Sequence, residues 1–304
     1  MSDFILHHYA LSPFSEKIRV MLGYAGLDWQ SVIVDEMPPR PKLEALTGGY
    51  RKIPVAQVGA DVFCDTRAIA REIARLADKP ELALENNSEA VRDFVEVVDL
   101  EVFLACIIAS SGPGLLLKMA RNTSVMHTYR FLKDRIAMGR TAKVKPIKPK
   151  QAKETVKAHL RRLEGMLSAD FLFGATPCIA DFSAYHSLWY VRDLAERKTT
   201  HAFPKVEAWM DRMAAFGHGN PTPITADDAL EQARGNEPRP LSDDGTETLV
   251  GSTVNIAPSD YARDPVRGIL VSADAQEWVV RRDEADLGTV HVHFPRQGFR
   301  IEQV

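Results

Sequence analysis

The period of hydrophobic and polar positions changes several times along the chain. Residues 4–9 form a short apolar and aromatic run that predicts a buried strand, and residues 14–25 place apolar side chains at helical spacing. Residues 29–34 predict a second strand, residues 52–58 and 62–64 a hairpin around a Gly-Ala-Asp turn, and residues 66–76 a helix. Residues 1–80 therefore predict an α/β domain that begins with a βαβ unit and a parallel strand pair.

The rest of the chain divides into a helical part, a linker and a β-rich part. From residue 88 to 220 apolar positions follow the helical period, which predicts an all-α second domain of about five helices. Residues 221–250 are rich in Gly, Pro, Asp and Glu and predict a linker. Over residues 251–304 apolar and polar residues alternate with a period of two, in five short β-rich segments separated by turns that contain Gly and Asp. This pattern predicts a small all-β domain, for which an SH3-like barrel is one candidate.

Composition and charge narrow the class of protein. The chain has 304 residues, of which 45% are hydrophobic and 26% charged, as in a soluble globular protein of more than one domain. A net charge of -3 with interspersed signs gives no reason to expect nucleic acid or an anionic membrane as a partner. The N-terminus lacks the features of a signal peptide, and no apolar run is long enough to span a bilayer.

The cysteines predict a reducing compartment. Only three are present, at positions 64, 106 and 178, with no Cys-x-x-Cys pair and no spacing typical of metal ligands. We therefore expect a cytosolic protein without a bound metal. His291 and His293 alternate on one face of a predicted strand, where a solvated sheet face is the expectation and a two-ligand metal site the alternative.

Ser12 lies at the junction of the first strand and the first helix. It is a favourable N-cap, and Pro13 suits the first helical turn because that position needs no amide hydrogen. A helix N-terminus stabilises an anion, and it can lower the pKa of a thiol from about 8.5 toward neutrality. A serine hydroxyl at this position could also donate a hydrogen bond to a bound sulfur. Taken alone, an N-cap serine is only a structural cap in most proteins.

Two further pairs of residues could complete a peptide-binding site. Pro54 follows Ile53 at the start of a predicted strand, where a cis bond would leave the backbone of Ile53 exposed to pair with an extended peptide. Asp65 and Thr66 begin the next predicted helix, where a carboxylate and a hydroxyl could hold the charged end of a peptide. Ser12, the Ile53-Pro54 pair and the Asp65-Thr66 pair follow one another on a predicted β-α-β-β-α pattern. Their order and spacing indicate that they belong to a single peptide-binding site.

Four segments resemble the cytosolic glutathione transferases. Residues 12–19 (SPFSEKIR) resemble the active-site helix start of the tau and omega types, which carry Ser-Pro-Phe or Cys-Pro-Phe. Residues 52–55 (KIPV) resemble the Val/Ile-Pro segment, and residues 65–69 (DTRAI) the Glu-Ser-x-Ala-Ile motif of the family. Residues 177–182 (PCIADF) resemble the capping box of its central helix. The resemblance covers residues 4–216, does not reach the tail, and implies a thioredoxin-like domain followed by a helical domain.

The resemblance implies glutathione as co-substrate and a role for each matching residue. Ser12 would activate the glutathione thiol, with Tyr9 and Ser15 as alternatives, and Phe14 would form part of the substrate wall. Ile53, followed by Pro54, would pair its backbone with the cysteinyl residue of glutathione.

The remaining implied contacts hold the two ends of glutathione. Asp65 and Thr66 would bind the γ-glutamyl end, and Lys52 and Arg40 would lie near the glycine carboxylate. The resemblance further implies a homodimer and a small, apolar electrophile as second substrate. The alternative function is a non-catalytic glutathione-transferase-like module whose β-rich tail recruits a partner.

Overall fold

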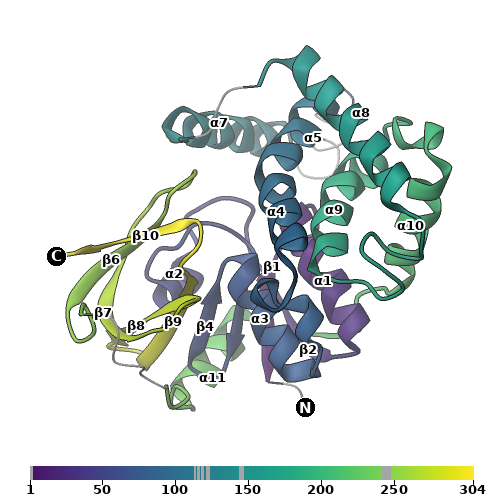
Figure 1. Ribbon diagram of the computed structural model, residues 1–304. Helices are drawn as coiled ribbons and strands as arrows, with labels where there is room; N and C mark the ends of the chain where they lie inside the picture. The colour runs from purple at the N-terminus through teal and green to yellow at the C-terminus, as the bar shows by residue number, and fades with distance from the viewer. Residues whose placement is uncertain are drawn as a thin grey trace.

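A computed structural model describes residues 3–112, 114, 117, 120, 124–143, 147–241 and 248–304 (Figure 1). The N-terminal α/β domain follows the order expected from the sequence, with an additional short helix, α2, in the loop before the hairpin. Its elements are β1 (Phe4–His8), α1 (Pro13–Ala25), β2 (Asp28–Ile33), α2 (Pro41–Thr47), β3 (Val55–Val58), β4 (Asp61–Cys64) and α3 (Thr66–Ala77). Strands β1 and β2 are parallel, and β3 and β4 form the expected antiparallel hairpin.

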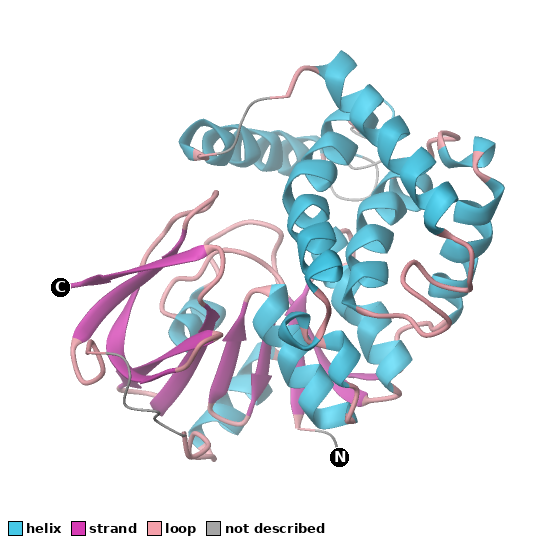
Figure 2. Cartoon of the chain, in the orientation of Figure 1, coloured by secondary structure: helices cyan, strands magenta, loops and turns pink. Residues whose placement is uncertain are grey.

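The second domain is helical, as the sequence predicts (Figure 2). Its long helices are α4 (Glu89–Val97), α5 (Phe103–Ser110), α7 (Val125–Thr141), α8 (Pro149–Met166), α9 (Ile179–Trp189) and α10 (Pro204–Ala215). A π-helical turn, Val98–Val102, joins α4 to α5 without a break in the helix, and a second, Tyr190–Leu194, extends α9. None of the helices in the described ranges has the length and apolar character that a bilayer crossing requires.

The C-terminal tail contains the five expected strands, and they are joined to the sheet of the N-terminal domain. The strands are β6 (Thr253–Pro258), β7 (Val266–Ala273), β8 (Glu277–Glu284), β9 (Gly288–Pro295) and β10 (Phe299–Gln303). Strand β9 pairs in parallel with β4, so that Val292 lies opposite Val62. The result is one ten-stranded sheet in the order β10-β6-β7-β8-β9-β4-β3-β1-β2-β5. The tail thereby covers an edge of the N-terminal sheet that would otherwise present unpaired backbone groups.

The region expected to be a linker, residues 221–250, contains two ordered elements. Strand β5 (Asn220–Pro223) pairs in parallel with β2 at the opposite edge of the sheet. Helix α11 (Ala226–Arg234) follows, and a capping box between Thr225 and Asp228 begins it. Its residues Ala229 and Ala233 are fully buried, which explains why this polar segment is helical. Residues 242–247 of the expected linker lie outside the described part of the chain.

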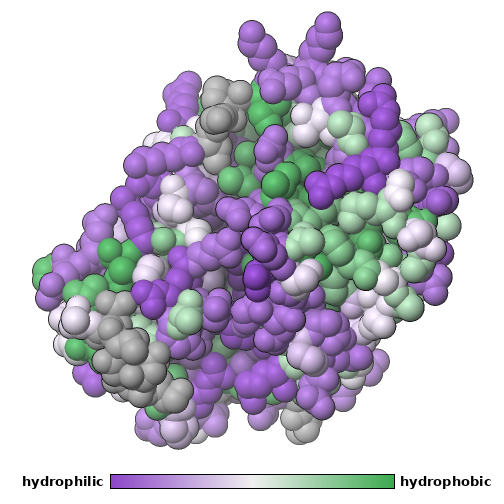
Figure 3. Space-filling model, in the orientation of Figure 1, coloured by the Kyte–Doolittle hydropathy of each residue, from purple (hydrophilic) through white to green (hydrophobic). Residues whose placement is uncertain are grey.

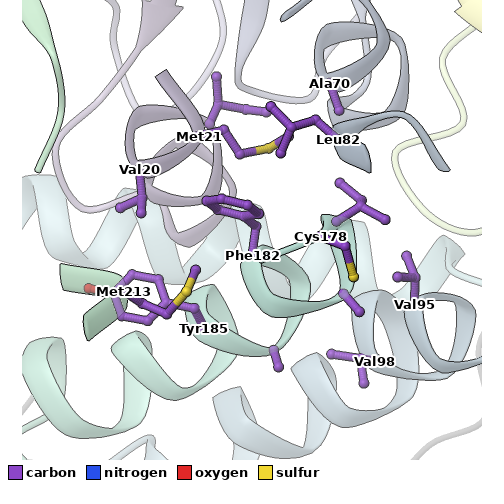
Figure 4. Close-up of a cluster of buried hydrophobic side chains, with 14 of the residues drawn as sticks. Val20, Met21, Ala70, Leu82, Val95, Val98, Cys178, Phe182, Tyr185 and Met213 are labelled. Carbon is purple, nitrogen blue, oxygen red and sulfur yellow. The ribbon is translucent and has the colours of Figure 1, made fainter. Parts of the chain in front are cut away.

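Two large apolar clusters fill the interior. The first joins α1 and α3 of the N-terminal domain to α4, α8, α9 and α10, and Figure 4 shows part of it around Phe182. The second joins α2, β3 and β4 to the strands of the tail, and includes Val62 together with Val280, Val292 and Phe294. On the face shown in Figure 3, hydrophilic residues cover most of the surface and hydrophobic residues gather over the helical half. The tail therefore shares a core with the N-terminal domain.

A buried histidine lies where the tail joins the sheet, which corrects the expectation of a solvated strand face. His293 on β9 is fully buried, and its Nε2 lies 2.8 Å from Oδ1 of Asp61 on β4. Its Nδ1 lies 3.4 Å from a carboxylate oxygen of Glu277, and its ring stacks on Phe63 at 4.5 Å. Burial lowers the pKa of His293, but the hydrogen bond with Asp61 and the nearby negative charge of Glu277 outweigh burial and raise it above the ordinary value. His291 lies 4.0 Å from the same carboxylate of Asp61.

Candidate active site

Ser12 is the N-cap of α1, as the sequence predicts. Its Oγ accepts a hydrogen bond of 3.1 Å from the backbone N–H of Ser15, and Pro13 occupies the first helical position. Ser12 is 2% exposed, so the hydroxyl is held in a nearly dry environment. Because a hydroxyl has one donor and two acceptor positions, the accepted bond leaves its proton available to donate in another direction.

A buried ion network fixes the loop that leads into Ser12. Arg19 donates to the carbonyl oxygens of Tyr9 (3.3 Å) and Ala10 (3.0 Å) and pairs with Glu16 at 2.6 Å. His218, beyond α10, lies 3.1 Å from the other carboxylate oxygen of Glu16. Burial alone would raise the pKa of Glu16, but His218 and Arg19 lower it below its usual value. Arg19 is thus a positioning residue for the strand-to-helix junction.

A cavity of about 350 Å³ opens beside Ser12, between the N-terminal and helical domains. One part of its lining is apolar and comes mainly from the helical domain: Phe14, Phe103, Leu104, Ile107, Phe131, Met138, Tyr190 and Leu194. Another part is charged and comes from α7 and from the loops around α2: Glu36, Arg40, Arg51, Lys52, Asp134 and Arg135. The cavity therefore has both charged and apolar lining residues in addition to Ser12.

Six of the ten predicted site residues line this cavity. They are Tyr9, Ser12, Phe14, Arg40, Lys52 and Ile53. The other four, Ser15, Pro54, Asp65 and Thr66, are not among its lining residues. Ser15 is fully buried beneath the helix start, and the bond between Ile53 and Pro54 is cis, as the sequence predicts.

The two basic residues predicted for a carboxylate already have partners. Arg40 is 8% exposed and donates from Nε to the carbonyl of Asp35 (2.7 Å) and from Nη1 to the carbonyl of Arg51 (2.8 Å). Its pKa is lowered, chiefly by burial. Lys52 places Nζ 2.7 Å from a carboxylate oxygen of Asp260 in the tail. Lys52 is thus in an ion pair, whereas the partners of Arg40 are uncharged carbonyl groups.

Asp65 and Thr66 begin α3, as the sequence predicts. The carboxylate of Asp65 accepts a hydrogen bond of 3.0 Å from the backbone N–H of Arg67, and the backbone at Asp65 has φ of 82°. Thr66 is 7% exposed. Burial, followed by the charges of Asp260 and Asp65, raises the pKa of Tyr261 well above its ordinary value. Tyr261 also lines the cavity.

The sequence pattern did not reveal that the tail contributes to the cavity. Tyr261 and Ala262, in the loop between β6 and β7, are lining residues, and Ala262 is buried with φ of 50°. Lys52 also lies under the ring of Tyr261, with Nζ 4.0 Å from its centroid. The sequence offers one signal, a polar loop (SDYARD) between two predicted strands. The position of this loop along the chain does not predict that it lies beside the cavity.

The cysteines and possible metal ligands offer no second reactive centre in the described ranges. Cys64, Cys106 and Cys178 are free and buried, and burial raises the pKa of Cys64 well above that of an ordinary thiol. Thiols of this kind are poor nucleophiles at neutral pH. No group of three or more potential ligand side chains among the described residues is arranged around a metal position.

Comparisons with known proteins agree with this architecture. Residues 6–81 match the family model for the N-terminal domain of glutathione S-transferase, and residues 126–216 match that for its C-terminal domain. A crystal structure of a GST-like protein from Pseudomonas syringae shares 35% identity over 100% of both chains, with a TM-score of 0.80. A glutathione S-transferase from Rhodospirillum rubrum F11 shares 19% identity over 70% of this chain and 88% of its own, with a TM-score of 0.50. No curated protein matches the chain.

Proposed function

Since the chain belongs to the glutathione S-transferase family, we propose that it activates the thiol of glutathione beside Ser12 for attack on small, apolar electrophiles. The observation that carries the proposal is the position of Ser12. Its hydroxyl stands at the N-terminus of α1 and lines a cavity with an apolar wall. That combination brings a stabilised anion and an apolar molecule within reach of each other.

Two physical effects support thiolate formation at this position. The positive end of the helix dipole at the start of α1 favours negative charge, and the Ser12 proton can donate to the sulfur. Both interactions strengthen when the thiol becomes a thiolate, so they lower the pKa of the bound thiol. In the proposed reaction the thiol proton passes to solvent, the sulfur electron pair forms the new bond to the electrophile, and any leaving group departs with its bonding electrons.

The charged region of the cavity supports binding of the peptide. We propose that the backbone of Ile53, preceding Pro54, pairs with the cysteinyl residue of glutathione, and that Lys52 and Arg40 lie near its glycine carboxylate. Asp65 and Thr66 would then bind the γ-glutamyl end. The apolar part of the lining, to which Phe14 belongs, would hold the electrophile.

Replacing Ser12 with alanine tests the proposal. One charge-assisted hydrogen bond contributes about 1.5–3 kcal/mol, so the pKa of bound glutathione should rise by roughly 1–2 units and turnover should fall about 10- to 100-fold. Ultraviolet difference spectra of the glutathione complex against pH measure the thiolate directly. Isothermal titration calorimetry measures binding separately, and binding of the tripeptide should change little.

Ser15→Ala is the matched control, because the Ser15 side chain is buried beneath the same helix start and is not part of the cavity lining. It should leave the thiolate signal unchanged. Tyr9→Phe examines one of the two alternative activating residues, and a loss of the thiolate in the Ser15 variant would favour the other. A thiolate that survives in the Ser12 variant and disappears in the Tyr9 variant would overturn the assignment. Glutathione binding without any thiolate in the wild-type protein would instead favour a non-catalytic binding module.

We also propose that the protein is a homodimer, and α7 supports this. Val125, Tyr129 and Ile136 are 78%, 61% and 56% exposed, and their spacing places them on one face of the helix. The cavity-lining residues of α7 lie on its other side. An exposed apolar stripe of this kind favours contact with a second subunit.

Tyr129→Glu should convert a dimer to a monomer, because a charge in the centre of an apolar interface is costly to desolvate. Light scattering coupled to size-exclusion chromatography gives the mass. Ile33→Glu, a similar change at a residue 67% exposed on β2, is the control and should leave the mass unchanged. A wild-type protein that is monomeric at all concentrations would contradict the proposal.

We further propose a cytosolic location. The three free, buried cysteines are consistent with a reducing compartment. Fractionation of the source cells would check it, and recovery in an extracytoplasmic fraction would contradict it.

A further inference from the structure

The loop between β6 and β7, residues 259–265, reaches from the tail into the proposed glutathione site. Asp260 is its charged contact, with Oδ1 2.7 Å from Nζ of Lys52. The two side chains are 25% and 15% exposed, so the pair is largely shielded from water. Tyr261 follows in the chain and places its ring over the same ammonium group, at 4.0 Å. The positive charge of Lys52 is therefore already neutralised by the chain itself.

The backbone holds Asp260 in this position from both domains. Its carbonyl accepts a hydrogen bond of 2.8 Å from the N–H of Lys143, which follows α7 in the helical domain. The preceding Ser259 donates from its N–H and its hydroxyl to the carbonyl of Gly298, each at 2.9 Å. The loop therefore connects the tail to the helical domain, and two of its residues, Tyr261 and Ala262, line the cavity.

We infer that Asp260 is a specificity-determining residue that occupies Lys52 in place of a ligand carboxylate. A bound peptide carboxylate would have to displace Asp260 from Lys52, and it would gain one ion pair while the protein lost another. The exchange of partners at Lys52 then contributes close to zero to the affinity, and any preference for the free carboxylate would come from Arg40 alone, whose Nε and Nη1 already donate to the carbonyl oxygens of Asp35 and Arg51. The inference rests on the proposed function, because it assumes that glutathione binds with its glycine end toward Lys52.

The consequence concerns the class of thiol that the site accepts. A site with a free lysine would discriminate against thiol peptides whose C-terminal carboxylate is esterified or amidated. Because Asp260 pairs with Lys52, this site should bind the peptide with a free C-terminal carboxylate and the esterified or amidated peptide with similar affinity. Its selectivity would come instead from the thiol, the γ-glutamyl end and the apolar region.

The test compares glutathione with its glycine monoethyl ester by isothermal titration calorimetry. In the wild-type protein the two ligands should bind within about threefold of each other. Asp260→Asn removes the competing charge and keeps the side-chain shape, so it should tighten glutathione about tenfold and leave the ester unchanged. Asp264→Asn, an exposed aspartate of the same loop, is the matched control and should alter neither affinity.

Each outcome decides the question. If Asp260→Asn leaves the affinity for glutathione unchanged, or if the wild-type protein binds glutathione at least tenfold more tightly than the ester, the inference fails while the proposed function stands. If neither ligand binds to wild-type protein or variant, both fail. Asp260→Ala is measured in parallel, because it removes the same charge if the asparagine variant does not fold. The comparison of the two ligands in the wild-type protein requires no variant.

Discussion

Replacing Asp181 with alanine should lower the free energy of unfolding by roughly 3–5 kcal/mol, the largest effect we expect from a single substitution. Asp181 lies in the first turn of α9 and is fully buried. Its carboxylate accepts hydrogen bonds from the backbone N–H of Leu172 (2.9 Å), the backbone N–H of Cys178 (3.0 Å) and Nε1 of Trp209 (2.9 Å). Alanine would leave these three donors without their acceptor.

Few other groups could compensate for the loss. The contacts of Asp181 connect the start of α9 to the loop before it and to α10, and all three donor residues belong to the first apolar cluster. Burial raises the pKa of Asp181, and the hydrogen bonds from Leu172, Cys178 and Trp209 only partly oppose that rise. Since water cannot readily reach buried donors, each unsatisfied group retains its desolvation cost of about 1–3 kcal/mol.

Denaturant unfolding followed by circular dichroism measures the effect of this substitution. Asp170→Ala, an exposed aspartate in the loop before α9, is the control and should change stability by less than about 0.5 kcal/mol. A loss below about 1 kcal/mol for Asp181→Ala would show that the three donors find new partners.

The sequence predicted the fold best where one short segment carries its own signal. Ser12 and Pro13 mark a helix start by local chemistry, and Asp65 does the same for α3. Helix α1 separates β1 from β2, and a tight turn joins β3 to β4, so the parallel pair and the hairpin follow from chain connectivity. The confirmed cis bond before Pro54 belongs with these local predictions.

The prediction failed where contacts join distant segments. A hydrophobic period of two predicts which side chains of a strand are buried. It does not predict which other strands or helices bury them. The strands of the tail pair with one another and, through β9, with β4, and the alternation of apolar residues does not predict this second pairing. Strand β5, with sequence NPTP, lacks any alternation and forms because it lies at the free edge of β2, where its prolines leave no ladder bond unmade.

The same limitation applies to the site. The resemblance selected Lys52, yet nothing near Lys52 in the sequence indicates that Asp260, more than two hundred residues later, would pair with it. His293 is similar, because its neighbours in the sequence are those of an ordinary strand, while its carboxylate partner Asp61 belongs to another domain. Ion pairs of this kind depend on the docking of the tail and are visible only in the folded chain.

Ending the chain at Leu241 should therefore abolish folding of the N-terminal domain, in contrast to removal of an independent barrel. The truncation would remove β6 to β10 and leave β4 as an open sheet edge. It would also expose apolar residues of the shared cluster, among them Leu46, Val55 and Val62. We expect a protein that is insoluble, or that melts without a cooperative transition.

The magnitudes support this expectation. Exposing one fully buried aliphatic side chain costs about 1.5–3 kcal/mol, so the loss of a few of them is comparable with the whole stability of a domain, about 5–15 kcal/mol. Asp61 would in addition lose the buried histidine that lies 2.8 Å from it. A full-length chain cut at a protease site inserted within residues 242–247 is the matched control, because its tail can remain docked. If the truncated chain is soluble and melts cooperatively near the temperature of the cut control, the tail is an accessory to a self-sufficient domain; if only the cut control does so, the sheet is a single folding unit.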